Sequence, residues 1–455
     1  MSGRESIEAP ATTEEMPARL RSDGSRPVLI VVGDAAEGGG VAAGERLIPF
    51  ERAVEIGRQP QIEPGVATCC LQDARVSGRH ARVRARADGF EVVDLGSTNG
   101  TLVEGRKIAG PTKVEDGTLL FVGGHALVLR VLSADALEAI REDLDRPFGP
   151  VPTLSDSMAL QVRRMRRLAP TGEAILLSGE TGTGKEVYAQ AVHRASGRPG
   201  RFVALNCAAL PTELAESELF GFVRGAHSQA VANKPGLIEQ AEHGTLFLDE
   251  IGDMPGPAQA KLLRFVQAHE YLPLGGREVR QIDVRVIAAT SSLTPGQHTH
   301  GLRRDLLARF GAAPVVLPPL RERREDVGTL AAYFLGQPRF WEGAALLALC
   351  LHDWPQNVRE LENLAREAVL SSRGAREIQL EDLPPGLRER VEKGQGESGP
   401  RRRPPRAAPE KAEIEALLDR HKGNIAEVAR ELDRQWAVVW RWVQKSGFDL
   451  DKFRK

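Results

Sequence analysis

The stretch that decides the fold reads Gly179-Glu180-Thr181-Gly182-Thr183-Gly184-Lys185. It follows the apolar run 174–177 and precedes a helix-like segment, 186–195. Glycines let backbone N–H groups curl around phosphate oxygens, and the amino end of a helix adds positive potential. Lys185 is placed to reach a β- or γ-phosphate as a point charge. The stretch predicts a phosphate-binding loop. The alternative is a glycine-rich turn with an incidental lysine, since Glu186 stands where Ser or Thr usually serves magnesium.

A second element decides between these alternatives. The apolar run 245–248 ends in two carboxylates, Asp249 and Glu250. Asp249 is placed to hold Mg²⁺, directly or through water, and Glu250 is placed to polarise the attacking water. A solvent-facing acidic pair at a strand end is the alternative. Because a phosphate loop lies upstream, we predict ATP hydrolysis, with ATP and Mg²⁺ as cofactors.

Strand-like runs alternate with helical patterns through the middle of the chain. The expected strands are 174–177, 202–205, 245–248, 284–289 and 314–317. This alternation predicts a parallel α/β sheet. Residues 324–383 then become mostly helical. The apolar stretch Gly343–Leu351 is far shorter than the ~20 residues of a membrane span, so it predicts a buried helix and no membrane association.

The front of the chain carries short β-like runs separated by turns. Examples are 28–32, 81–84, 90–93 and 127–129. This spacing predicts an all-β sandwich. The residues before it, 1–27, are polar and acidic without an apolar signal core, which predicts a disordered N-terminus. The four cysteines lack the spacing of a zinc site, which predicts reduced thiols in a cytoplasmic protein.

From Val151 to about Leu383 the sequence resembles the AAA+ domain of bacterial enhancer-binding proteins, the sigma-54-dependent transcriptional activators. The segments that carry the resemblance are Gly179–Glu186, Asn206–Leu210, Ser217–Gly221, Gly244–Gly252, Leu317–Arg323 and Trp354–Glu362. The family's phosphate loop includes the glutamate after the lysine, which removes the objection raised by Glu186. The resemblance implies an α/β ATPase subdomain with a helical lid and, in this family usually, a hexameric ring.

The resemblance also implies roles for single residues around the nucleotide. Asn206 is expected to hydrogen-bond Glu250 and to restrain it until the nucleotide state changes. Thr290, at the end of the expected strand 284–289, is expected to sense the γ-phosphate. Arg359 is implied as the sensor on the lid side, and its alternative is a surface helix charge.

Two further arginines are implied to act between subunits. Arg303 and Arg309 lie in Arg303-Arg304-Asp305-Leu306-Leu307-Ala308-Arg309. A fixed guanidinium can neutralise charge that develops on a γ-phosphate. The resemblance therefore implies arginine fingers inserted into a neighbour's ATP site, and with them a homo-oligomer. Their alternative is again a surface helix charge.

One loop departs from the family pattern. The family's sigma-54 contact loop reads Gly-Ala-Phe-Thr-Gly-Ala, whereas this chain reads Gly225-Ala226-His227-Ser228-Gln229-Ala230. An aromatic anchor has become an imidazole, and a conformationally free glycine has become a glutamine. The change weakens the expected sigma-54 contact without touching ATP hydrolysis. Smaller departures are Ser291 for the usual Asn and Gln356 for the usual Gly.

Three turns of the front sandwich carry a recognisable set of polar residues. Gly57-Arg58, Ser77-Gly78-Arg79-His80 and Ser97–Thr101, in this order, resemble a forkhead-associated (FHA) domain over about Val28–Leu132. A dianionic phosphate favours a guanidinium, a hydroxyl and backbone N–H groups. Arg58, Ser77 and the Gly78 backbone supply these three.

The remaining members of this set have implied supporting roles. Thr98 and Asn99 are expected to hold the phosphopeptide backbone, and Arg79 to add positive charge at the rim. His80 is expected to brace the loop. The set predicts binding of a phosphothreonine-containing protein. The alternative is a purely structural docking sandwich.

The tail is basic and helical. From Arg401 to Lys455, fourteen Lys and Arg oppose nine Asp and Glu, a local net of +5 within a chain of formal charge −1. Residues 412–418 and 425–432 have helical apolar spacing, and 435–445 predict a third helix. On it, Val439 and Val443 lie four apart and are expected to face the core.

This tail resembles the Fis-type helix-turn-helix that ends many enhancer-binding proteins. The third helix is implied to enter the major groove of DNA. The candidate DNA-binding residues are Gln435, Trp436, Trp440, Arg441 and Lys445. Two tryptophans are unusual on a groove face, and packing in a dimer is their alternative role. Arg401–Arg403 could add phosphate attraction or be solvated.

These inferences combine into one predicted multidomain architecture. Its parts are a disordered N-terminus (1–27), an FHA domain (28–133), an AAA+ α/β subdomain (150–318), a helical lid (319–388), a flexible linker (389–410) and a helix-turn-helix (411–455). The predicted function is an ATP-dependent regulator that binds promoter or enhancer DNA. As a homo-oligomer, a hexamer when active, it remodels RNA polymerase with sigma-54 under phosphothreonine control. The alternative is a DNA-binding regulator or repressor with an ATP-driven assembly switch that does not act through sigma-54.

Overall fold

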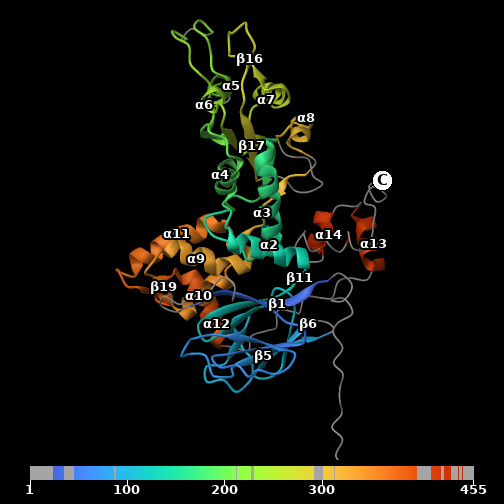
Figure 1. Cartoon of the computed structure of the whole chain (residues 1–455), viewed down its shortest axis with the longest axis vertical. Helices are drawn as coiled ribbons and strands as arrows, with labels where there is room; N and C mark the ends of the chain where they lie inside the picture. The colour runs from blue at the N-terminus through green and yellow to red at the C-terminus, as the bar shows by residue number, and fades with distance from the viewer. Residues whose placement is uncertain are drawn as a thin grey trace, which may run out of the picture. The chain divides into compact units, whose positions relative to one another are not determined.

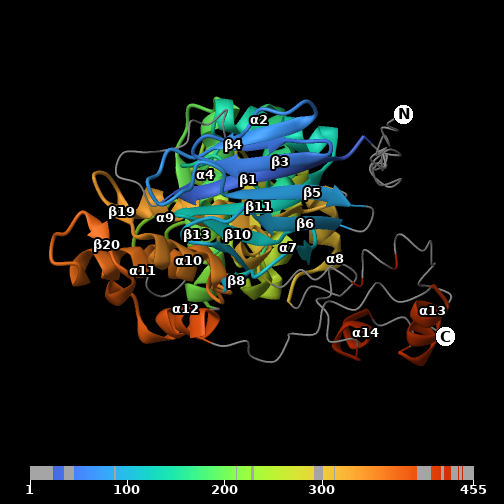
Figure 2. The ribbon, with the colours of Figure 1, turned by 90° about the horizontal axis from the view of Figure 1, so that it is seen from below.

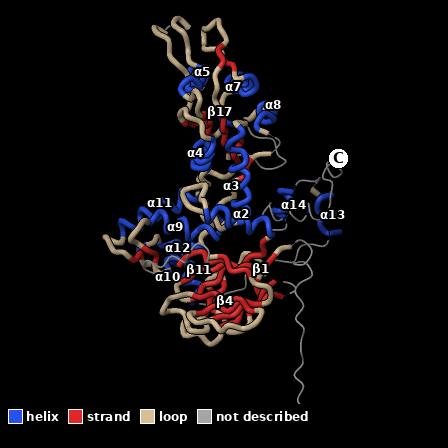
Figure 3. The backbone as a smooth tube through the Cα atoms, in the orientation of Figure 1, coloured by secondary structure: helices blue, strands red, loops and turns tan. Residues whose placement is uncertain are grey.

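The computed structural model describes residues 24–34, 46–86, 89–211, 213–226, 230–291, 301–311, 313–396, 411–421, 425–431, 439 and 443. The chain divides into two compact units, Met1–Gln395 and Gly396–Lys455. The first unit holds a β-sandwich, an α/β subdomain and a helical lid (Figures 1 and 3). In the part of the chain that is described, no helix combines the length and the apolar composition that a membrane span requires.

The front of the first unit is the predicted all-β sandwich (Figure 2). Its strands are β1 (Arg26–Asp34), β2 (Leu47–Pro49), β3 (Ala53–Gly57), β4 (Val66–Cys70), β5 (Ala81–Arg86), β6 (Gly89–Asp94), β7 (Thr101–Val103), β8 (Arg106–Lys107), β9 (Thr112–Val114), β10 (Leu119–Val122) and β11 (His125–Leu132). One sheet has the order β2-β1-β11-β10-β7-β8 and the other β4-β3-β5-β6-β9. Their facing side chains, such as Leu29, Ile56 and Val83, form one apolar core.

Strand β1 is buried on both faces. Leu29 and Val31 face the sandwich core, whereas Val28 and Ile30 pack under helix α2 (Ala134–Asp145) and the start of α3 (Asp156–Leu168). A bulge between Val31 and Gly33 then turns Val32 into a third cluster, which belongs to the lid. An unbroken apolar run is what a strand covered on both sides requires. The sandwich is therefore packed against helices α2 and α3 and against the lid.

The α/β subdomain confirms the predicted parallel sheet. Five parallel strands take the order β13-β14-β17-β12-β18. They are β12 (Ile175–Ser178), β13 (Phe202–Asn206), β14 (Thr245–Asp249), β17 (Arg285–Thr290) and β18 (Val315–Val316). The other elements are α4 (Lys185–Ser196), α5 (Ala215–Phe220), α6 (Leu237–Gln240), α7 (Gly256–Ala268), α8 (Arg304–Leu307), the hairpin β15 (Glu270–Tyr271) and β16 (Arg280–Gln281), and the short turns η2 (Ala169–Thr171), η3 (Cys207–Ala209), η4 (Ile251–Asp253) and η5 (Ala308–Phe310).

The lid follows the last strand. It contains η6 (Leu320–Glu322), η7 (Arg324–Asp326), α9 (Val327–Leu335), α10 (Gly343–Leu351), α11 (Asn357–Ser371), α12 (Pro385–Gly396), β19 (Phe340–Trp341), β20 (Glu377–Ile378) and η8 (Leu380–Asp382). Helix α10 covers the apolar stretch predicted to be a buried helix, and its side chains from Ala345 to Cys350 are almost fully buried. Trp354, with no exposed surface, anchors the lid core.

The second unit has its own small core. Helices α13 (Lys411–Arg420) and α14 (Ile425–Glu431) contribute Ile414, Leu418 and Val428 to it. Val439 and Val443 are fully buried in the same cluster, which confirms that these two valines face the core. The candidate DNA-binding residues Gln435, Trp436, Trp440, Arg441 and Lys445 lie outside the described residues.

Candidate functional site

The glycine-rich stretch joins β12 to α4 at the carboxyl edge of the parallel sheet. Gly182 and Gly184 have φ angles of 81° and 101°, a region of backbone conformation that favours glycine. Lys185 is the first residue of α4 and only 7% exposed. Its Nζ donates to the Gly179 carbonyl at 2.9 Å and lies 3.3 Å from Glu250 Oε1. The loop thus presents a desolvated cation beside a helix amino end.

The two carboxylates stand opposite this lysine. Asp249 ends β14, and Glu250 follows it with a φ of 50°, which is unusual for a residue with a side chain. Burial, assisted by the charge of Glu250, raises the pKa of Asp249, while Lys185 acts against the rise. A carboxylate held in this way gains from a nearby cation, because opposite charge offsets its desolvation.

Glu250 is hydrogen-bonded by Ser291, which stands where the family usually has Asn. The backbone N–H and the hydroxyl of Ser291 both donate to Glu250 Oε2, each at 2.8 Å. The expected partner, Asn206, uses its amide oxygen to accept from Ala208 N–H at 3.0 Å and so caps the turn η3. In this structure, therefore, Ser291 and Lys185 occupy the place at Glu250 that was expected of Asn206.

A cavity of about 660 Å³ opens between the phosphate loop and the lid. Its lining combines Lys185, Asp249 and Glu250 with tyrosine, phenylalanine and aliphatic side chains. The lining residues include Pro150, Val151, Thr181, Gly182, Thr183, Gly184, Glu186, Tyr188, Leu330, Tyr333, Phe334, Val358, Arg359 and Glu362. A lining that combines charged groups with aromatic and aliphatic side chains suits a ligand that carries both phosphates and a flat ring.

The lid is hydrogen-bonded to the phosphate loop. Asn357, at the start of α11, donates from Nδ2 to Glu180 Oε2 at 3.1 Å and to the Thr181 carbonyl at 3.0 Å. A Cβ on Gly182 would lie 2.2 Å from the Gln356 carbonyl oxygen, so only glycine fits between loop and lid. Arg359, the predicted lid sensor, lines the cavity from the same helix.

The other predicted nucleotide residues lie beside the loop or away from it. Thr290 ends β17, is buried, and accepts from Gly179 N–H through its carbonyl at 3.2 Å. Arg303 is about half exposed and pairs with Asp305 at 2.7 Å. Arg309 is also exposed, beyond the end of α8. The described residues that line the cavity do not include either arginine.

The sigma-54 contact loop is described only at its base. Gly225 N–H donates to the Ala230 carbonyl at 2.8 Å, and Gly225 has a φ of 81°. A Cβ on Gly275, near the hairpin β15–β16, would lie 2.8 Å from the Ala226 side chain. The altered positions His227, Ser228 and Gln229 lie outside the described residues.

The phosphopeptide candidates meet on three neighbouring loops of the sandwich. Arg58 N–H donates to the Ser77 carbonyl at 3.0 Å, and Thr98 N–H donates to the Ser77 hydroxyl at 3.1 Å. A Cβ on Gly57 would lie 2.2 Å from the Gly78 carbonyl oxygen, which explains the glycine there. Arg58 and Thr98 remain exposed at the surface. The loops are thus adjacent and open to a ligand.

Buried polar groups hold these loops from below. His80 is fully buried; its Nδ1 accepts from Ser77 N–H at 3.1 Å and its Nε2 faces the Gly100 carbonyl at 3.2 Å. This confirms the bracing role expected of His80. Arg79 pairs with the buried Glu55 at 2.8 Å while its side chain stays 47% exposed, so its contribution of positive charge at the rim stays a prediction.

Phosphate loop, strand-end carboxylates and lid arginine together define a phosphate-loop nucleotide-binding domain of the AAA+ class. Three family models match the sequence of this chain. A sigma-54 interaction domain matches residues 152–316, an AAA+ ATPase lid domain matches 321–399, and an FHA domain matches 54–123. The transcriptional regulatory protein GlrR of Escherichia coli is 36% identical over 333 residues, covering 70% of this chain and 73% of GlrR. The chain belongs to the sigma-54-dependent transcriptional regulators.

Other relatives match over the ATPase part. The putative uric acid sigma-54-dependent transcriptional regulator UacR of Escherichia coli is 45% identical over 236 residues, which is 50% of this chain and 40% of UacR. The DNA-binding transcriptional regulator NtrC of a Bradyrhizobium species is 46% identical over 233 residues, which is 49% of this chain and 48% of NtrC. The chain thus spans about half or less of the length of these two relatives.

Proposed function

We propose that the protein hydrolyses ATP in the cavity between its phosphate loop and its lid. The observation that carries the proposal is the convergence of Lys185, Asp249 and Glu250 in the lining of that cavity. Lys185 binds the β- and γ-phosphates as a point charge. Glu250 orients the attacking water and accepts its proton. The aromatic and aliphatic side chains of the lining, such as Tyr333 and Phe334, hold the base and keep water away from the phosphates.

The residues present also fit a magnesium ion. Asp249 offers a carboxylate oxygen, the ligand type that Mg²⁺ prefers, at a position where burial disfavours its charge. Bound there with the nucleotide, Mg²⁺ would neutralise phosphate charge. The Glu186 side chain lies in the first turn of α4, next to the same cavity.

The active enzyme is proposed to be a ring, with a hexamer as its working form. Arg303 and Arg309 are exposed and do not line the cavity of their own chain in the structure as described. An exposed arginine that completes a neighbour's site places charge on the γ-phosphate only in the assembled state. ATP turnover is then tied to assembly.

The ring is proposed to work on RNA polymerase that carries sigma-54, in the cytoplasm, at promoters or enhancers bound by a C-terminal helix-turn-helix. GlrR and NtrC are named as transcriptional regulators, and the sigma-54 interaction domain spans the ATPase subdomain. The FHA loops are proposed to bind a phosphothreonine-containing protein through Arg58, Ser77 and the Gly78 backbone. A kinase signal would thereby reach the ATPase.

Transcription in vitro tests the whole proposal. Purified protein, sigma-54 RNA polymerase and ATP are combined on a promoter template that carries the protein's own DNA site, and open-complex formation is measured. Open complexes that depend on ATP hydrolysis support remodelling of sigma-54 polymerase. Normal ATPase and DNA binding without open complexes, and without sigma-54 binding, support instead a regulator or repressor whose ATP site drives assembly. His227→Phe then serves as a probe, because it restores the aromatic anchor in the altered loop.

A further inference from the structure

One short stretch contacts both the phosphate loop and the FHA sandwich. It is Leu320–Asp326, here named the connecting segment, and it links β18 to the lid helix α9 through the turns η6 and η7. Its side chains point in two directions. Arg321 and Arg323 reach the phosphate loop, whereas Arg324 and Glu325 reach the sandwich.

The contacts toward the phosphate loop are made by two guanidinium groups. Arg321 Nη1 donates to Glu180 Oε2 at 2.8 Å, and this pair lowers the pKa of Glu180. Arg323 is only 3% exposed, lines the nucleotide cavity, and donates from Nη2 to the Thr183 carbonyl at 3.0 Å. A donor on that carbonyl fixes the peptide unit between Thr183 and Gly184, immediately before Lys185. Arg323 therefore sets the backbone from which the loop's N–H groups point.

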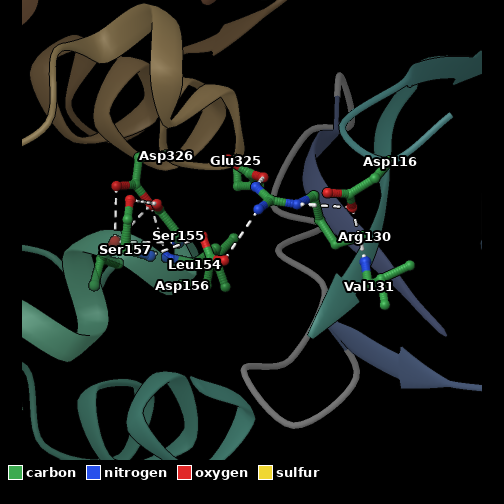
Figure 4. A network of polar contacts seen from close by, with 10 residues as sticks. Asp116, Arg130, Val131, Leu154, Ser155, Asp156, Ser157, Glu325 and Asp326 are labelled. Carbon is green, nitrogen blue, oxygen red and sulfur yellow. Dashed lines mark hydrogen bonds and ion pairs between the residues drawn. The ribbon is translucent and has the colours of Figure 1, made fainter. Parts of the chain in front are cut away.

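The contacts toward the sandwich include a buried ion pair. Arg130 on β11 binds Glu325, which is 2% exposed, and the same guanidinium reaches Asp156 at 3.1 Å and Asp116 at 3.2 Å (Figure 4). Beside it, Arg324 Nη1 donates to both oxygens of Glu104 at 3.0 Å. A buried carboxylate depends on its partner, because loss of one member leaves an uncompensated charge.

Asp326 contacts both the residues just before α3 and Arg323. It accepts from the Thr153 hydroxyl at 2.7 Å. It also accepts from Leu154 N–H at 2.7 Å (Figure 4). The oxygen that accepts from Thr153, Oδ2, also lies 3.7 Å from Arg323 Nη1. Glu325 and Asp326 are consecutive, so the residue that pairs with Arg130 is joined by one peptide bond to the residue that faces Arg323.

Apolar packing keeps the sandwich on the lid. Val32, Phe121 and Val128 of the sandwich share one buried cluster with lid side chains such as Val327 and Leu346. A Cβ on Gly328 would lie 2.4 Å from the Val32 carbonyl oxygen, so strand β1 and helix α9 touch through their backbones. Separation would expose this cluster to water. The sandwich and the lid therefore share one apolar core.

The loops proposed to bind phosphopeptide adjoin this interface. Asn99 Nδ2 donates to the Arg75 carbonyl at 2.7 Å, and a Cβ on Gly343, at the start of α10, would lie 3.4 Å from Arg75 Nη1. The strand β7 leads from Asn99 to Glu104, the partner of Arg324. A ligand on Asn99 would thus be linked to the lid through one residue, Arg75, and would lie five positions along the chain from Glu104.

We propose that Arg323 is a positioning residue for the phosphate loop and that the FHA sandwich controls it through the Arg130–Glu325 pair. The inference rests on the proposed function, since it concerns the same ATP and phosphopeptide sites. It makes the sandwich a structural component of the nucleotide site. By linkage, ATP affinity and occupation of the FHA loops must then change each other by the same factor.

The test measures the dissociation constant for ATP, by calorimetry on the full chain. Arg130→Met leaves Glu325 without its partner and is expected to raise the constant about fivefold or more. The double variant Arg130→Met with Glu325→Met removes both charges and is expected to return within about twofold of wild type. Arg84→Met, on the same sandwich but paired with Glu91 of its own sheet, is the matched control and is expected to match wild type.

Two further variants keep the test decisive if Arg130→Met does not fold. Arg324→Met breaks only a partly exposed pair and is expected to raise the ATP constant about two- to threefold. Arg323→Met is expected to raise it about tenfold or more, with part of the affinity regained in Arg323→Lys. Folded Arg130 and Arg324 variants that bind ATP as wild type overturn the control by the sandwich. Wild-type protein that binds no ATP overturns the proposed function itself.

Discussion

The nucleotide cavity and the loops proposed to bind phosphopeptide present their candidate phosphate-binding cations in opposite ways. In the cavity the cation is buried: Lys185 is 7% exposed and already faces Glu250. On the loops Arg58 is exposed, and the buried groups, His80 and Glu55, lie beneath as braces. A charge in a desolvated site acts strongly on its ligand, whereas an exposed one is screened by water and salt. We therefore expect substitutions in the cavity to reduce ligand binding or turnover more than substitutions in the loops reduce ligand binding.

The two sites also differ in completeness. The loops draw every candidate residue from one sandwich. The cavity takes residues from the α/β subdomain and the lid, and its proposed fingers come from a neighbouring chain. A site shared between chains can be switched by assembly, while one that is complete within a domain is always ready for its ligand. The FHA loops suit an input, and the cavity suits an output.

The largest expected effect concerns the shared character of the cavity. Arg303→Ala should lower ATP turnover by about 10³-fold or more while leaving ATP affinity unchanged, because the guanidinium acts on a neighbour's γ-phosphate. Steady-state turnover and calorimetry measure the two quantities. Mixing this variant with Asp249→Ala should recover part of the activity at mixed interfaces. No recovery at any mixing ratio contradicts a finger that acts between chains.

Removal of the buried cation should have the next largest effect. Lys185→Ala is expected to weaken ATP binding by about 100-fold, on the order of 2.7 kcal/mol, since a charge-assisted contact in a desolvated site is lost. Calorimetry with ATP measures it. The control is phosphopeptide binding by the same variant, which should be retained. Wild-type ATP affinity in this variant rules out the assigned role of the loop.

Removal of the exposed Arg58 should weaken ligand binding less than removal of Lys185 does. Arg58→Ala is expected to weaken binding of phosphothreonine peptides, selected from a peptide library, by about 30-fold, or about 2 kcal/mol. Its thermal unfolding should match wild type. Arg79→Ala is the matched comparison, with a loss of about threefold or less, because Glu55 already holds its guanidinium. Equal losses in the two variants would show that Arg79 also contacts phosphate.

The last expected effect is one of pH on the stability of the sandwich, through the buried Glu55 beneath the loops. Burial alone would raise the pKa of Glu55, but hydrogen bonds from Arg79, Gln61 N–H and Arg82 lower it from 4.5 to about 2. A carboxylate whose pKa is lowered by folding stabilises the fold above its unfolded pKa, and this stability is lost as pH falls through the folded value. Between pH 4.5 and 2 the sandwich should therefore lose on the order of 2 kcal/mol.

Thermal unfolding at pH 5 and pH 3 checks this expectation, with Glu55→Gln as the reference. The variant should be less stable than wild type at pH 5, and its disadvantage should shrink at pH 3. A disadvantage that stays constant over this range would mean that Glu55 stabilises the sandwich by packing rather than by its charge.

Local patterns sufficed for much of the fold and of the site. Gly179–Lys185 could be assigned to a phosphate loop because conformational freedom and charge are encoded within seven consecutive residues. The carboxylates at the end of β14 followed from the alternation of strands and helices. Val439 and Val443 could be assigned as core residues from their spacing of four, whereas the bracing role of His80 followed from the resemblance to FHA domains.

Contacts between distant segments could not be assigned in this way. The partner of Glu250 is Ser291 in this structure, not Asn206, because the short amide caps a turn while the end of β17 brings the hydroxyl close. The unbroken apolar run on β1 carried a signal that was overlooked, since a strand without alternation is covered on both faces. It was the only mark in the sequence of a sandwich packed against the ATPase.

The sequence by itself determined which chemistry this chain carries: a phosphate loop, strand-end carboxylates and a sandwich with a phosphate-reading set of residues. Only the tertiary structure decided how these parts are joined. Arg130 and Glu325 are separated by 195 positions in the chain, yet they form one buried pair. In the unfolded chain these two charges are hydrated and far apart, and only folding brings them together and removes the water around them. For that reason the link between the sandwich and the nucleotide site could be found in the structure alone.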